Sequence, residues 1–279
     1  MTDGRPRLVM EALGLSRVTI VDGKVVEVTA PRLKYCPLFN KLRKIEEIDE
    51  AIVRENIEFR IREFGLGTEN RVVRAPDYVT FGVSEILSTA IEAGDIEAAV
   101  IVADGCGTAV VKEPAVVQGL CGRISGIIET TPLQVVLDAV GRDCVIDPET
   151  TPIDQVKGAE KAMAMGLKRF AVTVNCPEQA RIIREMCGDR VVLVAVHTSS
   201  ISEDAARRFF EYCDFITACA SKPLRDIAFS RDDIVVAGNK VQIFAVTDIG
   251  KKLVVDKLHS IGKEPWDGKT PTVDPQPWL

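Results

Sequence analysis

Thiols and imidazoles are the side chains of this sequence whose types and spacing most directly suggest chemistry. The chain has eight cysteines and two histidines, and successive cysteines lie 70, 15, 23, 32, 11, 26 and 6 residues apart. This spacing contains no CxxC pair, so no standard zinc ribbon or zinc finger can be written. We therefore predict no metal site from motifs, and expect the thiols to be small packing residues or individual reactive groups.

Cys176 is the first candidate for a reactive thiol. It directly precedes Pro177, and proline favours the first position of a helix, so the sulfur is expected at a helix N-terminus. Unpaired N–H groups there stabilise a thiolate and lower its pKa. His197 follows the next strand and is a candidate base or proton carrier, and Cys219 follows a later strand. The candidate catalytic residues are thus Cys176, His197 and Cys219, with a purely packing role as the alternative.

A glycine-rich loop is the second candidate. Residues 104–108 read Asp-Gly-Cys-Gly-Thr directly after an apolar strand, and such glycines let backbone N–H groups approach an anion. The loop lacks the third glycine of GxGxxG, and the chain contains no GxxxxGK[ST], so no particular cofactor is predicted. A plain tight turn is the alternative. The candidate ligand-binding or anion-binding residues are Asp104, Gly105, Gly107, Thr108 and Arg123.

Alternating strand and helix patterns must position these loops. Apolar, β-branched runs recur from residue 71 onward, separated by stretches that fit a short loop and a helix of about three turns. We predict an α/β fold of serial βα units in a mostly parallel, doubly wound sheet with helices on both faces, and a (β/α)8 barrel as the alternative. A second hairpin pattern at 235–241 favours the open sheet. The predicted strands are 98–103, 170–174, 191–196, 215–217 and 241–246, with weaker ones at 124–128 and 144–146.

The two ends of the chain differ in pattern from this core. Residues 1–70 predict a small α+β part, with a hairpin around Asp22-Gly23 and a long helix that ends near Gly65. The α/β core is expected over 71–262. Residues 263–279 predict a proline-rich arm that carries both tryptophans, either packed on the core or used as a contact for a partner.

Charge and hydropathy exclude several classes of protein. With 35 basic and 41 acidic side chains and no basic cluster, the chain lacks the electrostatic pattern of a nucleic-acid-binding protein. The longest apolar runs span six residues, far short of the ~20 that a membrane helix needs. No apolar leader follows Met1, and we expect a cytoplasmic protein.

Four motifs resemble a known family. They are residues 34–38 (Lys-Tyr-Cys-Pro-Leu), 104–108, 117–126 and 213–222, and together they sample nearly the whole chain. In these motifs the sequence resembles methanogenesis marker protein 8, an archaeal family also described as a domain of unknown function. The resemblance implies a methanogenic archaeon and a role tied to methanogenesis, without a particular activity, substrate or catalytic residue. It also implies a reducing cytosol, which favours free thiols.

Three hypotheses for function follow. The first is an accessory or maturation factor for the methanogenic machinery, for example for methyl-coenzyme M reductase, whose partners are methanogenesis proteins or a second copy of the chain. The second is an enzyme that uses a Cys/His site at the carboxyl ends of the strands on a small-molecule ligand. The third is a metal or iron-sulfur carrier built from loop thiols. We predict neither nucleic acid nor membrane as a partner.

Overall fold

Two sheets organise the molecule. The computed structural model describes residues 4–77, 81–122, 126–238, 240–269 and 274–278. The larger sheet has seven strands in the order β10-β11-β9-β8-β7-β4-β5, and its four central strands, β9, β8, β7 and β4, run parallel. The bounds are β4 Ala99–Ala103, β5 Gly107–Val111, β7 Phe170–Val174, β8 Val191–Ala195, β9 Phe215–Thr217, β10 Val235–Ala237 and β11 Ile243–Ala245.

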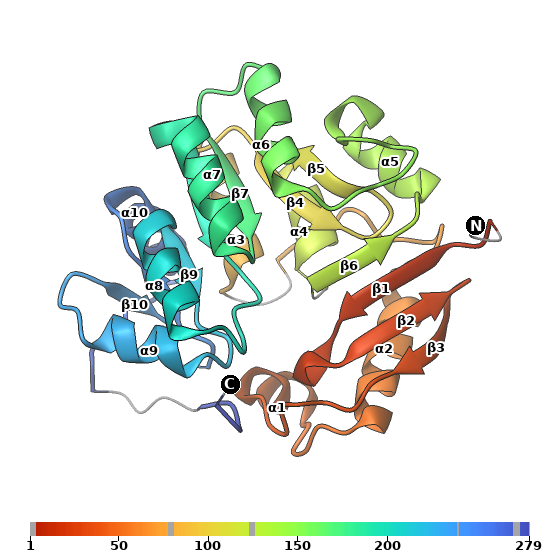
Figure 1. Cartoon of the computed structure of the whole chain (residues 1–279), viewed down its shortest axis with the longest axis horizontal. Coiled ribbons are helices and arrows are strands. Elements are labelled where there is room, and N and C mark those ends of the chain that lie inside the picture. Colours follow the sequence, from red (N-terminus) through yellow and green to blue (C-terminus); the bar gives the residue numbers. More distant parts are fainter. Residues whose placement is uncertain (1–3, 78–80, 123–125, 239, 270–273, 279) are drawn as a thin grey trace.

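Helices cover both faces of this sheet (Figure 1). One apolar core packs α3, α4, α5 and α10 against the sheet, and a second core packs α6 to α9 against its opposite face. The mixed α/β fold predicted from the sequence is therefore confirmed. The helix bounds are α3 Val83–Glu92, α4 Pro114–Cys121, α5 Gln134–Val140, α6 Gln155–Ala164, α7 Pro177–Cys187, α8 Glu203–Tyr212, α9 Lys222–Phe229 and α10 Asp248–Ser260, with short 3-10 turns η2 Arg142–Cys144 and η3 Gly188–Arg190.

The second sheet is small and antiparallel, in the order β3-β2-β1-β6. The hairpin of β2 and β3 turns at Asp22 and Gly23, both at positive φ, as the Asp-Gly pair predicts. A third apolar core joins this sheet to α2, which ends at Gly65. The bounds are β1 Arg7–Glu11, η1 Leu13–Leu15, β2 Arg17–Val21, β3 Lys24–Val28, α1 Pro37–Arg43, α2 Glu50–Phe64 and β6 Gly126–Thr130.

Three local predictions were wrong. The chain after β4 makes a tight turn through Gly105 and Gly107, at φ of 85° and 61°, and returns as the antiparallel strand β5, which is absent from the predicted strands. The strand expected near 124–128 is β6, which pairs with β1 in the small sheet instead of joining the large one. The strand expected at 144–146 is reduced to one bridge between Val145 and Ala109. In each case a β-rich segment formed a pairing that residue types alone do not specify.

The arm at the carboxyl end packs on the rest of the molecule. Trp266 lies 5.5 Å from Phe229 between ring centroids, and Arg225 lies 4.3 Å from the centroid of the Trp278 ring. Gln276 exchanges backbone hydrogen bonds with Tyr35, just before α1, so that the C-terminus lies beside α1 in Figure 1. No helix within the described residues is both long and apolar enough to cross a lipid bilayer.

Candidate functional site

A cleft lies between the carboxyl ends of the parallel strands and the N-terminal part. Each of the four parallel strands supplies at least one lining residue at or beside that end, as expected for ligand sites of open α/β sheets. Opposite them stand α1, α2 and the start of α3. The strand residues that line the cleft are Val102, Thr173, Val196 and Thr217.

The cleft has two adjoining lobes. The inner lobe, of about 310 Å³, reaches from α1 and α2 to the strand ends, and the outer lobe, of about 560 Å³, extends past Cys36 toward the C-terminal arm at Pro275. Together they have the size of pockets that hold small molecules and cofactors. The lining residues common to both lobes are Leu38, Phe39, Leu42, Gly82, Val83, His197, Thr217, Cys219 and Val241.

His197 and Cys219 share an unusual backbone conformation at the boundary of the two lobes. Their φ angles are 53° and 40°, in the left-handed region that side chains other than glycine rarely adopt. Such a conformation costs on the order of 1–3 kcal/mol, and it persists where the surrounding structure enforces it. His197 and Cys219 follow the neighbouring parallel strands β8 and β9, and each of them lines the inner and the outer lobe. The two left-handed backbone conformations therefore lie in the same part of the cleft.

A set of hydrogen bonds holds the Cys219 loop in this shape. The buried guanidinium of Arg225 donates to the carbonyl oxygens of Cys219 at 2.8 Å, Ser221 at 3.0 Å and Ala218 at 3.3 Å. The hydroxyl of Thr217 lies 3.6 Å from the Cys219 sulfur. Arg225 therefore fixes the backbone of the loop that carries the Cys219 thiol.

The environment of the cleft alters the ionisation of its groups. His197 lines the cavity and its side chain is exposed there, while the protein packed around it lowers the pKa of His197 to about 4 by desolvation. Burial raises the pKa of Cys36, with backbone N–H groups of the first turn of α1 opposing the shift and Cys219 adding to it. Burial likewise raises the pKa of Cys121 to about 12. At neutral pH the site therefore holds a neutral imidazole that can accept a proton, and Cys36 and Cys121 as protonated thiols.

Cationic side chains outnumber acidic ones in the described lining of the cleft. The acids are Glu11 and Glu85, in a chain that carries six more acidic than basic residues overall. A cleft of one sign focuses its field on ligands of the other sign. The lining therefore favours an anion. The cationic lining residues are Lys41, Arg43, Arg60, Lys240 and Lys263.

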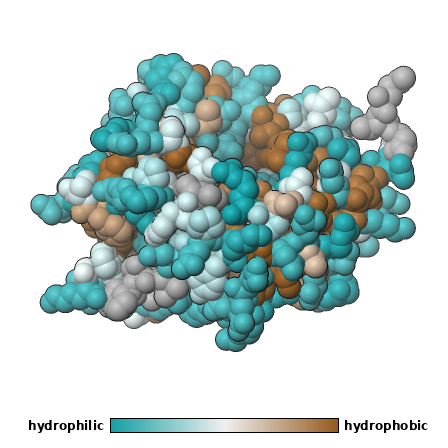
Figure 2. Space-filling view, turned by 60° about the horizontal axis from the view of Figure 1, so that its bottom comes forward, coloured by the Kyte–Doolittle hydropathy of each residue, from teal (hydrophilic) through white to brown (hydrophobic). Residues whose placement is uncertain are grey.

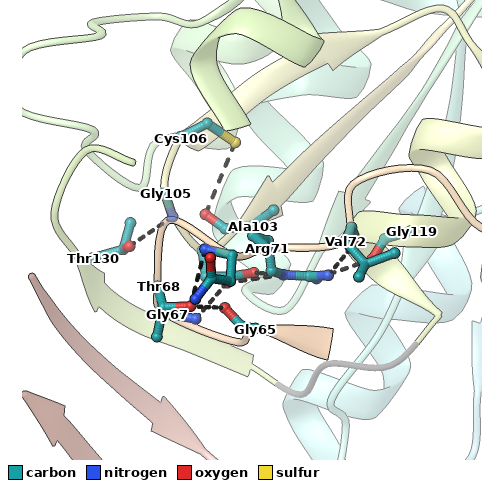
Figure 3. Close-up of polar contacts among 12 residues, drawn as sticks. Gly65, Gly67, Thr68, Arg71, Val72, Ala103, Gly105, Cys106, Gly119 and Thr130 are labelled. Carbon is teal, nitrogen blue, oxygen red and sulfur yellow. Dashed lines mark hydrogen bonds and ion pairs between the residues drawn. The ribbon is translucent and has the colours of Figure 1, made fainter. Parts of the chain in front are cut away.

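Asp104 lies behind this cleft, in a buried junction. Its carboxylate accepts from Arg71 Nε at 3.0 and 3.1 Å and from the Gly67 backbone N–H at 2.9 Å, and both side chains of the ion pair are at most 1% exposed. In Figure 3 the Arg71 side chain extends toward the carbonyls of Val72 and Gly119, to which it also donates. The ion pair ties the end of α2 to the β4–β5 turn and α4.

The remaining residues of the predicted glycine loop also make contacts within the protein. The Gly105 N–H donates to Thr130 Oγ1 at 2.8 Å, and Thr108 Oγ1 accepts from the Asp154 N–H at 2.8 Å. A side chain at Gly107 would meet a backbone carbonyl, so this glycine permits close packing. Arg123 lies outside the described residues. None of the four described loop residues lines either lobe.

The structure thus brings together only part of the predicted catalytic set. His197 and Cys219 share the cleft, whereas Cys176, the residue before the first turn of α7, is not among the described lining residues. All eight cysteines are free thiols. Among the described residues, no group of three or more His, Cys, Asp or Glu side chains is arranged to hold a metal ion.

Sequence reasoning did not assign several lining residues to the site. Cys36 and Asn56 come from the N-terminal part, and Glu85 and Cys121 from α3 and α4, far from the strand ends in sequence. One signal was present for Asn56. It occupies a buried position in the helical repeat of α2, where an apolar residue is expected.

Comparisons with known proteins place the chain among archaeal sequences. A family model described as "Uncharacterized protein conserved in archaea (DUF2099)" matches residues 8–259. An uncharacterized protein of Methanocaldococcus jannaschii is 43% identical over 262 residues, which cover 92% of each chain. The family match therefore covers both sheets and most of the cleft lining, and Lys263 and Pro275 of the outer lobe lie beyond it.

Proposed function

The chain belongs to the archaeal family DUF2099, and we propose that it is an enzyme that binds a small anionic molecule in the cleft around His197 and Cys219. One observation carries this proposal. These two residues take costly left-handed conformations at the ends of adjacent strands and line both lobes of the same cavity. Strain of this kind is concentrated at ligand and active sites.

The roles of the two residues follow from their chemistry. Cys219 is the nucleophile, because a thiol becomes reactive once it loses its proton. His197 is the neighbouring proton carrier: its imidazole is neutral at physiological pH, and its lowered pKa makes it a weaker base than an ordinary histidine. The cationic lining supplies the affinity for an anion, and the apolar side chains of α1, such as Leu38, Phe39 and Leu42, contact its hydrocarbon part.

Alkylation of Cys219 by two reagents tests the proposal. Iodoacetate and iodoacetamide have similar size and attack the same thiolate, but only iodoacetate is an anion. At low ionic strength we expect Cys219 to favour iodoacetate over iodoacetamide about threefold more than an unstructured cysteine peptide does. By Coulomb's law, any cation within about 10 Å of a thiolate contributes a few tenths of a kcal/mol in screened water. Peptide mass spectrometry after partial labelling measures the ratio at each cysteine.

Charge reversal of three lysines in the outer lobe tests the source of this preference, and charge reversal of two surface lysines elsewhere is its control. The triple change Lys41→Glu, Lys240→Glu and Lys263→Glu is expected to invert the preference of Cys219 for the anionic reagent. Lys112 and Lys168 are exposed and do not line the cleft, so their change to glutamate alters net charge and is expected to leave the ratio unchanged. An unreactive Cys219, or a ratio insensitive to the three cleft lysines, would contradict the proposal.

A link to methanogenesis is a second proposal. It is supported by the resemblance to methanogenesis marker protein 8 in the motifs at 34–38, 104–108, 117–126 and 213–222, and by a related protein in Methanocaldococcus jannaschii. In this proposal the protein is an accessory or maturation factor for the methanogenic machinery. Affinity purification of the tagged protein from a methanogen is expected to recover methanogenic subunits, and their absence would count against it.

A further inference from the structure

Two thiols from different parts of the fold border the outer lobe. Cys36 lies directly before α1 in the N-terminal part, and Cys219 follows β9 of the large sheet. Both are free thiols, and both side chains are partly exposed. Burial raises the pKa of Cys36, and the neighbouring Cys219 raises it further, an effect that weakens with distance. The two sulfur atoms therefore lie in the same part of the lobe.

The C-terminal arm connects the two segments that carry these thiols. The backbone of Gln276 pairs with Tyr35, immediately before the first thiol. Two residues further on, the Trp278 ring centroid lies 4.3 Å from the guanidinium carbon of Arg225. That guanidinium donates to the carbonyl oxygen of Cys219 at 2.8 Å. The arm thus joins the start of α1 to the Cys219 loop along the outer lobe.

The surroundings of the two thiols narrow the class of ligand. Among the described residues, the charged side chains that line the outer lobe are Lys41, Lys240, Lys263 and Glu11, so the lobe favours an anion. The side of the molecule where α1 and the C-terminus lie comes forward in Figure 2, and its described hydrophobic patches are separated by hydrophilic side chains. A docking surface for a protein is usually a continuous apolar area. A small molecule is therefore the better fit to the lobe.

We propose that Cys36 and Cys219 act as a dithiol that reduces a small anionic disulfide in the outer lobe. This inference rests on the proposed function, because it keeps Cys219 as the nucleophile and adds the class of its substrate. Cys36 is a second catalytic residue, which resolves the mixed disulfide between Cys219 and the ligand.

The reaction balances in atoms and electrons. The Cys219 thiolate attacks one sulfur of the ligand, the ligand S–S bond breaks, and the first ligand thiolate takes up the proton that Cys219 released. Cys36 then attacks the Cys219 sulfur, the bond between Cys219 and the ligand breaks, and the second ligand thiolate takes up the proton of Cys36. The ligand gains two electrons and two protons, and the protein gains one disulfide. An external dithiol returns the protein to its reduced form.

A coloured anionic disulfide tests this assignment. Dithiobis(nitrobenzoate) carries two carboxylates, and absorbance counts the thiolates that it releases. With less than one equivalent of reagent on the full reduced chain, we expect two thiolates for each reagent molecule consumed and a peptide linked through Cys36 and Cys219 in the mass spectrum. Because a disulfide needs its two Cα atoms within about 7 Å, this link also measures how close the segments come.

Serine variants identify the thiol that resolves the mixed disulfide. Cys36→Ser is expected to release one thiolate for each reagent molecule and to retain nitrobenzoate on Cys219. If this variant fails to fold, Cys36→Ala makes the same test. Cys144 and Cys176 are partly exposed thiols that do not line the described cleft, so their change to serine is expected to leave the count at two.

A pair of aliphatic disulfides tests the charge of the ligand. Dithiodipropionate is a dianion, and hydroxyethyl disulfide is neutral and of similar length. Relative to an unstructured cysteine peptide, the chain is expected to favour the dianion about threefold or more at low ionic strength. Charge reversal of Lys41, Lys240 and Lys263 is expected to remove this preference.

The outcomes separate this inference from the proposed function. A wild-type chain that releases one thiolate and retains the mixed disulfide on Cys219 would overturn the role of Cys36 and leave the anion site in place. Two thiolates from Cys36→Ser would overturn that role as well, because another thiol would then close the bond. A faster reaction with the neutral disulfide would refute the anionic substrate class. If Cys219 neither reacts with the reagent nor favours iodoacetate, the proposed function fails too.

Discussion

The buried ion pair between Asp104 and Arg71 gives the sharpest prediction about stability. Its two side chains are 0% and 1% exposed, so Asp104→Asn would keep the shape of the carboxylate but leave the guanidinium charge without its counter-ion in the protein interior. Removing one partner of a buried ion pair costs about 3–5 kcal/mol. At roughly 2–4 °C per kcal/mol, the thermal midpoint is expected to fall by about 6–20 °C.

An exposed pair in the same region provides the comparison. Arg74 and Glu113 form a two-contact ion pair at 2.8 and 2.9 Å, but their side chains are 54% and 47% exposed. Glu113→Gln is therefore expected to cost about 1 kcal/mol or less. Urea unfolding followed by circular dichroism measures both variants. The reasoning is refuted if Asp104→Asn destabilises the protein no more than Glu113→Gln does.

A double-mutant cycle separates the ion pair from the backbone bonds around it. Arg71→Met combined with Asp104→Leu removes both charges, but it also leaves the Gly67 N–H and the Gly119 carbonyl without their present partners. We expect the double variant to be less stable than the wild type, yet less destabilised than the sum of the two single changes by about 2 kcal/mol. Additive single effects would show that the two side chains contribute independently.

Three further predictions concern the cleft and the arm. In the native state iodoacetamide is expected to label Cys219 but not Cys106, which is 0% exposed and whose pKa is raised by burial; equal labelling would contradict the described burial. Because the protein lowers the pKa of His197 from its ordinary value of 6.5 to about 4, the unfolded chain takes up a proton at higher pH than the folded chain, so the free energy of unfolding is expected to fall as pH decreases from about 6.5 to 4. Urea titrations should show a different pH dependence for wild type and His197→Gln in that window and the same pH dependence above it. Deleting the chain from Gln276 onward removes its backbone pairing with Tyr35 and is expected to increase the labelling of thiols in the outer lobe, measured by mass spectrometry against the intact chain.

Strand and helix positions in the core could be predicted well from the sequence. The runs expected at 170–174 and 215–217 form β7 and β9 with the same bounds, because a buried parallel strand needs a short, continuous apolar segment. The proline after Cys176 also marks the start of α7. The similar Thr-Pro pairs at 131 and 151 do not begin helices; α5 and α6 start at Gln134 and Gln155. Local propensity is decisive where tertiary packing agrees with it.

The candidate site could be predicted only in part. His197 and Cys219 were available to sequence reasoning because each directly follows a strand, and parallel strands bring their carboxyl ends to one edge. Asp104 also follows a strand, but β5 folds back beside it and the carboxylate is enclosed against Arg71. The rule for strand ends identifies an edge of the sheet; it does not say which side chains of that edge remain open to a cavity.

The sequence by itself determined the α/β class, the main strands of the large sheet, the N-terminal hairpin and the absence of local metal-binding motifs, since these depend on residue type and near spacing. Tertiary structure alone decided that β6 leaves the large core to pair with β1, and that α1 and α2 close over the strand ends to form the cleft. The physical reason is that pairing and packing between distant segments depend on complementary shape, which no local pattern encodes. Asn56 illustrates the division: its polarity can be read from the sequence, but only the fold places it in the wall of the cleft.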